Sequence, residues 1–282
     1  MQGKTVVISG ATSGIGQVAA EKLAAIGARM VLVARDKPRG EAALARLRQA
    51  GPGAQHSIHY ADLSRLSEVK RVAAEIAAAE PRIDVLINNA GALFASRQVT
   101  EDGLELTFAL NHMSYFVLTH GLWERLRASA PARVINTASD AHKGEKLDFG
   151  DLQSAAGYRG LHVYGRSKLC NILYTSELAR RLAGSGVTAN SLHPGFVDTR
   201  FGDESGGLLS FAVRIAKTFA ISPEKGAETI VYLASSSDQQ VAEASGLYFY
   251  KCRPATPTRE ARDEDAARKL WQETERLAGI AG

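Results

Sequence analysis

The chain has 282 residues, of which 45% are hydrophobic and 23% are charged, and its formal net charge is +4. These proportions are typical of an ordinary globular protein and argue against wholesale disorder. Lysine and arginine are scattered among acidic residues, which argues against a surface that tracks nucleic acid.

The chain start and the cysteines bear on location. Met1 to Thr5 runs straight into a predicted strand, without the apolar region of a signal peptide, and no uncharged apolar run approaches the ~20 residues of a membrane-spanning helix. Cys170 and Cys252 form no CxxC pair, so neither a disulfide framework nor a metal site is indicated. We expect a soluble, cytoplasmic protein without an integral membrane segment.

Short apolar strands alternate with longer helical segments. Strands are predicted at residues 5–9, 30–33, 57–60, 84–88, 133–137, 188–193 and 247–250, and helices at residues 14–25, 39–50, 66–79, 104–128, 162–183 and 224–235. This alternation indicates βαβ units with right-handed crossovers. We therefore predict a single α/β domain over residues 1–282, a Rossmann-like three-layer αβα sandwich with a seven-stranded parallel sheet.

A glycine-rich turn follows the first predicted strand and opens the first helix. It reads Ser9-Gly10-Ala11-Thr12-Ser13-Gly14-Ile15-Gly16. Glycines let the backbone approach a pyrophosphate closely, and the helix N-terminus stabilises its charge. Taken alone, the G-x-x-x-G-x-G spacing also fits a tight structural turn without a ligand.

Further motifs follow the order of a known family. They are Asp62-Leu63, Asn88-Asn89-Ala90-Gly91, Asn111, Ser139, Tyr164-Gly165-Arg166-Ser167-Lys168 and Pro194-Gly195. With the glycine turn, in which Ser9 stands where the family usually has Thr, they make the chain resemble the short-chain dehydrogenases/reductases over almost its whole length. Runs such as Ser167-Lys168-Leu169-Cys170-Asn171 are similar to the retinol dehydrogenase branch.

Carbonyl reduction needs hydride from nicotinamide and a proton for the developing alkoxide. Tyr164 and Lys168 lie four residues apart on one predicted helix face, where the ammonium can favour the phenol's anion, although such a spacing also fits a plain surface pair. The resemblance implies that Tyr164 is the general acid/base and that Lys168 also grips the ribose. It further implies that Ser139 holds the substrate oxygen and Asn111 a relay water. Thr137 is a rival for Ser139, and Asn111 also fits a helix cap or kink.

Cofactor choice is predicted at the end of the second strand. The resemblance places Ala34 where NAD-preferring members carry Asp, and the following Arg35 can accommodate a 2′-phosphate. We therefore expect NADP(H), with NAD(H) less favoured, while Asp36 either pairs with Arg35 or faces a 2′-hydroxyl. The implied cofactor site comprises Gly10, Thr12, Ser13, Gly14, Ile15, Gly16, Arg35, Asp62, Leu63, Asn89, Ala90, Gly91, Tyr164, Lys168, Pro194, Gly195, Val197 and Thr199.

Two stretches interrupt or follow the strand-and-helix pattern. Residues 200–222 are predicted as a substrate lid, although their apolar run 207–219 with its two basic positions also fits a packing helix or a membrane-surface helix. Residues from 253 are predicted as a C-terminal trailer. The family often forms dimers or tetramers, and this trailer would alter or block the usual contacts.

The combined expectation is an NADP(H)-dependent oxidoreductase acting on a fairly lipophilic small molecule. Its substrate would be retinal-like or another carbonyl or alcohol, including steroid, quinone and other ketones. The rival class is a catalytically silent nucleotide-sensing protein, which has no need for the catalytic set of Asn111, Ser139, Tyr164 and Lys168. Three histidines beside the motifs, His112, His142 and His193, are expected to be hydrogen-bonded core residues, and Cys170 a packing residue.

Overall fold

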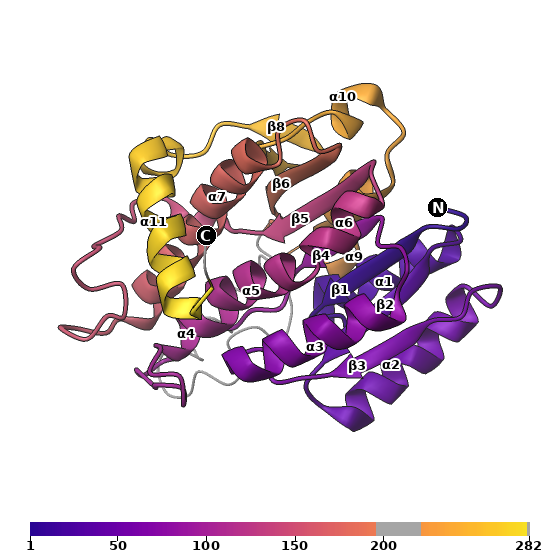
Figure 1. Cartoon of the computed structure of the whole chain (residues 1–282), viewed down its shortest axis with the longest axis horizontal. Helices are drawn as coiled ribbons and strands as arrows, with labels where there is room; N and C mark the ends of the chain where they lie inside the picture. Colours follow the sequence, from indigo (N-terminus) through magenta and orange to yellow (C-terminus); the bar gives the residue numbers. More distant parts are fainter. Residues whose placement is uncertain (196–220, 281–282) are drawn as a thin grey trace.

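The computed structural model of the chain describes residues 1–195 and 221–280. Within these ranges the strands form one eight-stranded sheet in the order β3-β2-β1-β4-β5-β6-β7-β8 (Figure 1). The strands are β1 (Thr5–Ser9), β2 (Arg29–Ala34), β3 (Ser57–Tyr60), β4 (Val85–Asn88), β5 (Ala132–Thr137), β6 (Val187–His193), β7 (Tyr248–Tyr250) and β8 (Arg253–Ala255). β1 to β7 are parallel, and the order reverses between β1 and β4, where open α/β sheets bind ligands.

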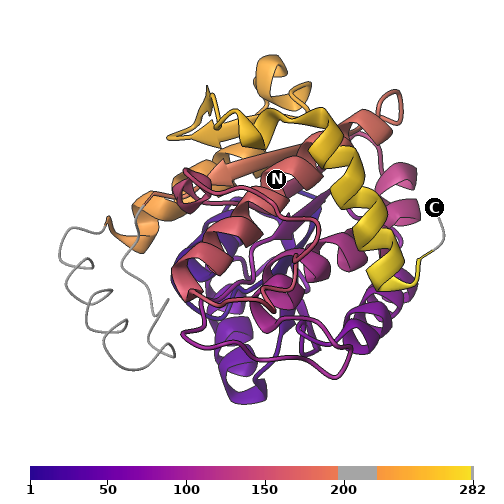
Figure 2. The same ribbon diagram turned by 90° about the vertical axis from the view of Figure 1, so that its left-hand side faces the viewer.

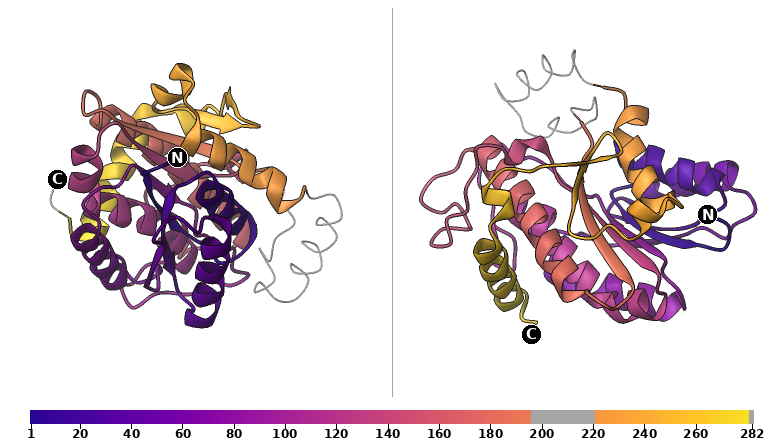
Figure 3. Two further views of the ribbon diagram at one scale, coloured as in Figure 1. Left: turned by 90° about the vertical axis from the view of Figure 1, so that its right-hand side faces the viewer. Right: turned by 90° about the horizontal axis from the view of Figure 1, so that it is seen from above.

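Helices cover both faces of this sheet (Figures 2 and 3). One face carries α1 (Gly14–Ala25), α2 (Lys37–Ala50) and α9 (Pro223–Ser235), and the other carries α3 (Leu66–Ala79), α5 (Ser114–Gly121) and α7 (Gly160–Arg181). Because side chains alternate along a strand, Val6 and Ile8 of β1 enter the first core and Val7 enters the second. The predicted three-layer αβα sandwich is confirmed.

The predicted strands and helices begin and end within two residues of those in the structure, with one exception. The helix predicted at 104–128 is broken into α4 (Leu106–Phe108), a π-helical turn η1 (Ala109–Met113), α5 and α6 (Trp123–Ala128). In η1 the Ser114 amide donates to the Ala109 carbonyl, one residue further back than in an α-helix. Such a widened turn depends on contacts of its own side chains, which hydrophobic periodicity does not predict.

The C-terminal extension predicted from residue 253 packs against the rest of the domain and does not trail from it. β8 pairs antiparallel with β7, which gives the sheet one strand more than the seven predicted. After η5 (Glu260–Arg262), helix α11 (Glu264–Ala278) lies along α7 (Figure 3). Trp271 of α11 packs against the rings of Phe116 and Tyr174, with centroid separations of 4.9 and 5.8 Å. The extension is therefore part of the hydrophobic core.

Of the predicted lid at 200–222, including the run 207–219, only Ile221 and Ser222 are among the described residues. Ser222 caps α9, where its hydroxyl accepts from the Lys225 amide at 3.4 Å. A short helix, α10 (Gln239–Ala242), follows α9. Across residues 1–195 and 221–280, no helix has both the length and the apolar character needed to cross a membrane.

Candidate active site

The glycine turn after β1 is held against the loop after β4. Gly10 has a φ of +70°, and a Cβ on it would lie 2.7 Å from the Ala90 Cα, while a Cβ on Gly16 would collide with the Gly10 carbonyl and the Asn89 side chain. The Ser9 hydroxyl accepts from the backbone amides of Asn89 and Ala90, both at 3.1 Å. A hydroxyl at Ser9 therefore joins the two loops that flank the switch point of the sheet.

The N-terminus of α1 is open to an anion. Ser13 is its N-cap residue but its side chain makes no capping hydrogen bond, and the first turn of α1 contains no acidic residue. The predicted cofactor residues Thr12, Ser13, Gly14 and Ile15 are all partly exposed at this end. The first amides of a helix need partners from outside the helix, and a pyrophosphate can supply them. The turn and the helix end therefore fit a dinucleotide.

The end of β2 presents one basic side chain beside a small buried one. Ala34 is 5% exposed, whereas Arg35 is exposed. Asp36 is the N-cap of α2, and its carboxylate accepts from the Arg39 amide at 2.9 Å. The sequence left open whether Asp36 faces a ribose or pairs with Arg35. The structure gives it the capping position.

Two further predicted cofactor segments follow β3 and β4 and lie, like the end of β2, at the carboxyl edge of the sheet. One carboxylate oxygen of Asp62 accepts from the amide and hydroxyl of Ser64, at 3.0 and 2.7 Å, and Leu63 is buried. The side-chain amide of Asn89 donates to the Gly10 carbonyl at 3.1 Å. Gly91 is exposed. Both segments shape the carboxyl edge of the sheet through their own local hydrogen bonds.

Asn111 lies in the π-helical turn η1, and its side chain ties three segments together. Its Oδ1 accepts from the Ala92 amide at 2.9 Å, and its Nδ2 donates to the Ala92 carbonyl at 2.9 Å and to the Ser167 hydroxyl at 3.0 Å. A Cβ on Gly91 would lie 3.1 Å from Asn111 Oδ1 and 3.4 Å from Lys168 Nζ. The side chain of Asn111 therefore holds the loop after β4 against α7, beside the lysine.

Ser139, Tyr164 and Lys168 meet at the carboxyl edge of the sheet. Ser139 follows β5 as the N-cap of η2 (Asp140–His142), and it hydrogen-bonds the Tyr164 side chain. One turn further along α7, Lys168 Nζ lies 5.5 Å from the centroid of the Tyr164 ring and donates to the Thr137 carbonyl at 3.0 Å. The structure brings the predicted acid/base pair and the predicted substrate-oxygen ligand together.

The rival hydroxyl, that of Thr137, is used elsewhere. It donates to the Asn89 side chain at 3.2 Å, on the side of the glycine turn. Ser139 is partly exposed, whereas Thr137 is 5% exposed. Of the two hydroxyls at the end of β5, Ser139 is therefore the one that faces the tyrosine.

Burial sets the charge states of the Tyr164 and Lys168 pair. It raises the pKa of the Tyr164 phenol, against the opposing effect of the hydrogen bond with Ser139. It lowers the pKa of Lys168 to about 7. At neutral pH the phenol keeps its proton, and the lysine is divided between charged and neutral forms. A bound anion would favour the ammonium.

The loop after β6 is described only in part. Pro194 and Gly195 are partly exposed, and Gly195 has a φ of +94°. A Cβ on Gly195 would lie 2.6 Å from the Ile221 Cδ1, so the two ends of the loop come close together. The predicted nicotinamide-binding residues Val197 and Thr199 lie outside the described residues.

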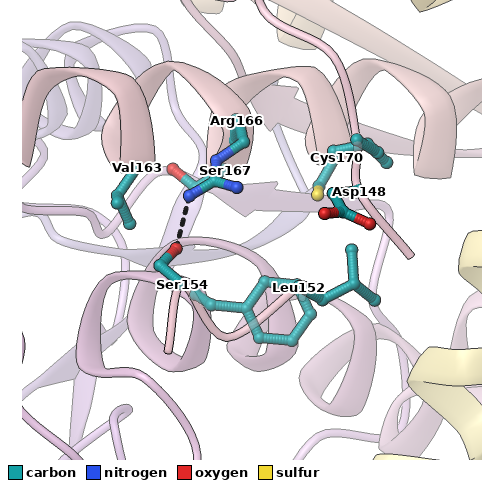
Figure 4. A pocket seen from close by; sticks show the side chains of 9 residues that line it. Asp148, Leu152, Ser154, Val163, Arg166, Ser167 and Cys170 are labelled. Carbon is teal, nitrogen blue, oxygen red and sulfur yellow. Dashed lines mark hydrogen bonds between the residues drawn. The ribbon is translucent and has the colours of Figure 1, made fainter. Parts of the chain in front are cut away.

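A cavity of about 10 Å³ lies beside α7 (Figure 4). Its lining residues are Phe108, Leu147, Asp148, Leu152, Ser154, Val163, Arg166, Ser167 and Cys170. Neither Ser139 nor Tyr164 lines it, and its volume suits at most about one water molecule. Burial raises the pKa of the Cys170 thiol to about 12, as expected for a packing residue. This cavity is therefore not a substrate site.

Sequence reasoning missed two contacts from the C-terminal extension to the site. His142 Nδ1 lies 2.7 Å from the Ser139 carbonyl, and its Nε2 accepts from the Thr258 amide at 3.4 Å. His112, next to Asn111, has its Nε2 3.0 Å from the Thr274 hydroxyl of α11. The available signal was the position of both histidines beside motif residues, but their partners are 116 and 162 residues away.

Known proteins resemble this chain in sequence and in fold. Residues 4–206 match the family described as short chain dehydrogenase. The chain is 42% identical over 293 residues to retinol dehydrogenase 14 of Mus musculus, covering 99% of this chain and 87% of that protein. A solved structure from Mycobacterium paratuberculosis has a TM-score of 0.79 at 31% identity, covering 99% of this chain and 94% of that one. A Burkholderia cenocepacia short chain dehydrogenase in complex with NADP has a TM-score of 0.69 at 25% identity, covering 88% and 95%.

The chain therefore belongs to the short-chain dehydrogenases, a family of oxidoreductases, and within it to the retinol dehydrogenase branch. The resemblance that the sequence motifs predict is confirmed over nearly the whole chain. Hydride transfer on an alcohol or carbonyl group is the activity of this class.

Proposed function

We propose that the chain is an NADP(H)-dependent enzyme that interconverts a carbonyl and an alcohol on a lipophilic small molecule. The observation that carries this proposal is the meeting of Ser139, Tyr164 and Lys168 at the carboxyl edge of the sheet, the edge at which α1 also begins. A hydroxyl and a protonated phenol in mutual contact offer two donors to one carbonyl oxygen. A protein that only senses nucleotide has no use for such a pair.

The roles of the residues follow from their charge states. Nicotinamide, when bound, supplies or accepts the hydride. Tyr164 keeps its proton at neutral pH because burial raises its pKa, so it can give that proton to the developing alkoxide. Lys168, held by the Thr137 carbonyl beside the Tyr164 ring, can then stabilise the phenolate. In the direction of alcohol oxidation the same groups act in reverse.

Arg35 supports a preference for NADP(H). An exposed guanidinium directly after the buried Ala34 can form a charge-assisted, bidentate contact with a 2′-phosphate. The carboxylate of Asp36 is engaged in capping α2, so it is not a free competitor for the guanidinium of Arg35. The Burkholderia cenocepacia neighbour, in complex with NADP, is in keeping with this choice.

Apolar side chains beside the site support a lipophilic substrate. Leu161, one turn before Tyr164 on α7, is 55% exposed, and Ile221, next to Gly195, is 38% exposed. Exposed apolar groups at the mouth of a site favour an apolar ligand. A relative named as a retinol dehydrogenase adds a retinal-like aldehyde to the candidates, alongside other aldehydes and ketones.

Compartment and assembly are proposed on separate grounds. Cys170 and Cys252 are both free thiols, which suits the reducing cytoplasm, and fractionation of cells that produce the chain tests this location. Self-association stays a prediction from the family, since α11 covers part of α5 and α7 in this chain. Light scattering after size-exclusion chromatography measures the oligomeric state.

The test of the proposed function is NADPH oxidation against a panel of carbonyl compounds. The panel contains aliphatic aldehydes of increasing length, retinal, steroid ketones and quinones, and calorimetry measures NADPH binding in parallel. We expect turnover of at least one member, with catalytic efficiency rising with the apolar area of the substrate. NADPH binding without turnover across the whole panel would instead favour the nucleotide-sensing alternative.

A further inference from the structure

A buried amide lies beside the tyrosine and lysine of the active site. Asn171 is fully buried three residues after Lys168 on α7. Its Nδ2 donates to the Asn111 carbonyl at 2.9 Å and to the Thr137 carbonyl at 3.3 Å. The same Thr137 carbonyl accepts from Lys168 Nζ at 3.0 Å. One amide group therefore joins the π-helical turn to the carbonyl that holds the lysine.

The directions of the hydrogen bonds around Asn171 are fixed by chemistry. Two backbone carbonyls can only accept, so the NH₂ group of Asn171 must face them and its Oδ1 must face His112, whose Nδ1 lies 3.4 Å away. His112 Nδ1 therefore carries the hydrogen. Burial lowers the pKa of His112 to about 4, so the ring is neutral near pH 7 and its Nε2 is an acceptor.

The acceptor Nε2 of His112 faces the C-terminal helix. Thr274 Oγ1 of α11 lies 3.0 Å from it and also donates to the Leu270 carbonyl of its own helix at 2.7 Å. A hydroxyl has one hydrogen, and the Leu270 carbonyl already has a helical backbone partner. With Nε2 an acceptor, the single Thr274 hydrogen is shared between His112 Nε2 and the Leu270 carbonyl in a three-centre hydrogen bond. The hydrogen bonds run in one direction, from Thr274 to His112 to Asn171 and on to the two carbonyls.

We propose that Asn171 is a positioning residue for the proton-transfer site and that His112 and Thr274 fix the orientation of its amide. The proposal rests on the function proposed above. A hydrogen bond restricts distance and direction, whereas apolar contact restricts neither so tightly. Helix α11 contributes none of the reacting groups. Through His112 and Asn171 it would nevertheless set the positions of the Thr137 carbonyl that holds Lys168 and of the Asn111 carbonyl.

A purely structural role is the competing explanation, because buried polar groups are normally paired whatever their function. The two explanations differ in what a small change at α11 does. A structural role predicts a loss of stability alone. A positioning role predicts a fall in kcat while the Michaelis constant and the NADPH affinity stay near their wild-type values.

The test uses Thr274→Val, which removes the hydroxyl and keeps the size of the side chain. We expect kcat to fall by about 5- to 20-fold, with KM and the NADPH Kd within about twofold, and Thr274→Ser to restore kcat. The matched control is Thr229→Val on α9, a buried threonine on the opposite face of the sheet whose hydroxyl accepts from the Cys252 amide at 3.2 Å. It should lose a comparable amount of stability and keep its kcat.

A second measurement does not depend on turnover. ¹⁵N NMR of the histidine rings in the wild-type protein reports which nitrogen of His112 is protonated, and we expect the Nδ1–H form. An Nε2–H form would overturn the proposal, as would equal kcat values for the two threonine-to-valine variants. If no member of the carbonyl panel is turned over, the proposed function fails by itself, and the tautomer still decides the direction of the hydrogen bonds.

Discussion

The two faces of the sheet are built from different chemistry. Helices α1, α2 and α9 bury mainly aliphatic side chains, such as Leu23, Leu47 and Ile230. The turn η1 and helices α5, α7 and α11 also bury aromatic rings and a set of hydrogen-bonded polar groups, namely Asn111, His112, Asn171, Thr175 and Thr274. Apolar burial is non-directional and hydrogen bonds are directional, so the first face contributes mainly stability and the second also determines geometry.

The largest effect is expected at Tyr164, the proposed proton donor on the second face. Tyr164→Phe removes the proton donor and leaves the ring, so we expect turnover to fall by about 10²- to 10⁴-fold while NADPH binding stays within a few-fold. Steady-state kinetics and calorimetry measure the two quantities. Retained turnover would show that Tyr164 is not the acid/base.

Matched truncations on the two faces test the comparison directly. Leu23 of α1 and Leu173 of α7 are 0% and 1% exposed, so alanine at either position should cost about 2 to 5 kcal/mol of unfolding free energy. Only Leu173→Ala, two residues from Asn171, should also lower kcat several-fold. Urea denaturation and kinetics at a temperature where both variants are folded are the measurements. Equal kcat values for the two variants would remove the functional difference between the faces.

Lys168 should be needed for catalysis but should lower the free energy of unfolding. Burial lowers its pKa from 10.5 to about 7, so the folded protein bears the full desolvation cost below pH 7 and none above pH 10.5. At about 1.4 kcal/mol per pKa unit, and allowing for the lost bond to Thr137, Lys168→Met should gain on the order of 2 kcal/mol at pH 6.5. That gain should shrink as the pH rises.

Denaturation of the wild type and Lys168→Met between pH 6 and pH 10 measures this gain. The exposed Lys146 provides the control, because Lys146→Met should change stability by less than about 0.5 kcal/mol at any of these pH values. A gain that grows with pH would contradict the buried-lysine argument. In every case Lys168→Met should be inactive.

The most local effect is expected at the edge of the sheet, away from both cores. Arg35 should give NADPH a preference of roughly 10- to 100-fold over NADH in kcat/KM, since a charge-assisted hydrogen bond contributes ~1.5 to 3 kcal/mol. Ala34→Asp combined with Arg35→Ile should invert that preference. Arg48→Ile, at the other end of α2, should leave it unchanged. A wild-type preference for NADH would mean that Arg35 does not govern the pocket.

Local signals predicted much of the fold and the candidate site. The strands, the glycine turn and the spacing of Tyr164 and Lys168 are properties of short segments, and the structure places them as expected. The π-helical turn was not predictable in this way, because it depends on bonds from Asn111 to Ala92 and Ser167, 19 and 56 residues away. The link from His112 to Thr274 spans 162 residues and leaves no local pattern.

The missed C-terminal helix is a different kind of error. In α11 the buried residues Ala267, Leu270, Trp271, Thr274 and Ala278 recur at helical spacing. The many charged residues between them hid this period, although charges on the opposite face are typical of an amphipathic helix. Its N-cap Asp263 and its final Gly279, in the left-handed conformation, are ordinary helix signals as well.

The position of α11 in the chain also has a consequence for synthesis. Every strand of the sheet is translated before α11. Until α11 has left the ribosome and docked, the rings of Phe116 and Tyr174 lack their contact with Trp271, and His112 lacks Thr274. The glycine-rich turn can therefore form early on the nascent chain. The contacts of α11 behind the proton-transfer groups form last. A chaperone that shields aromatic surface would have its opportunity in that interval.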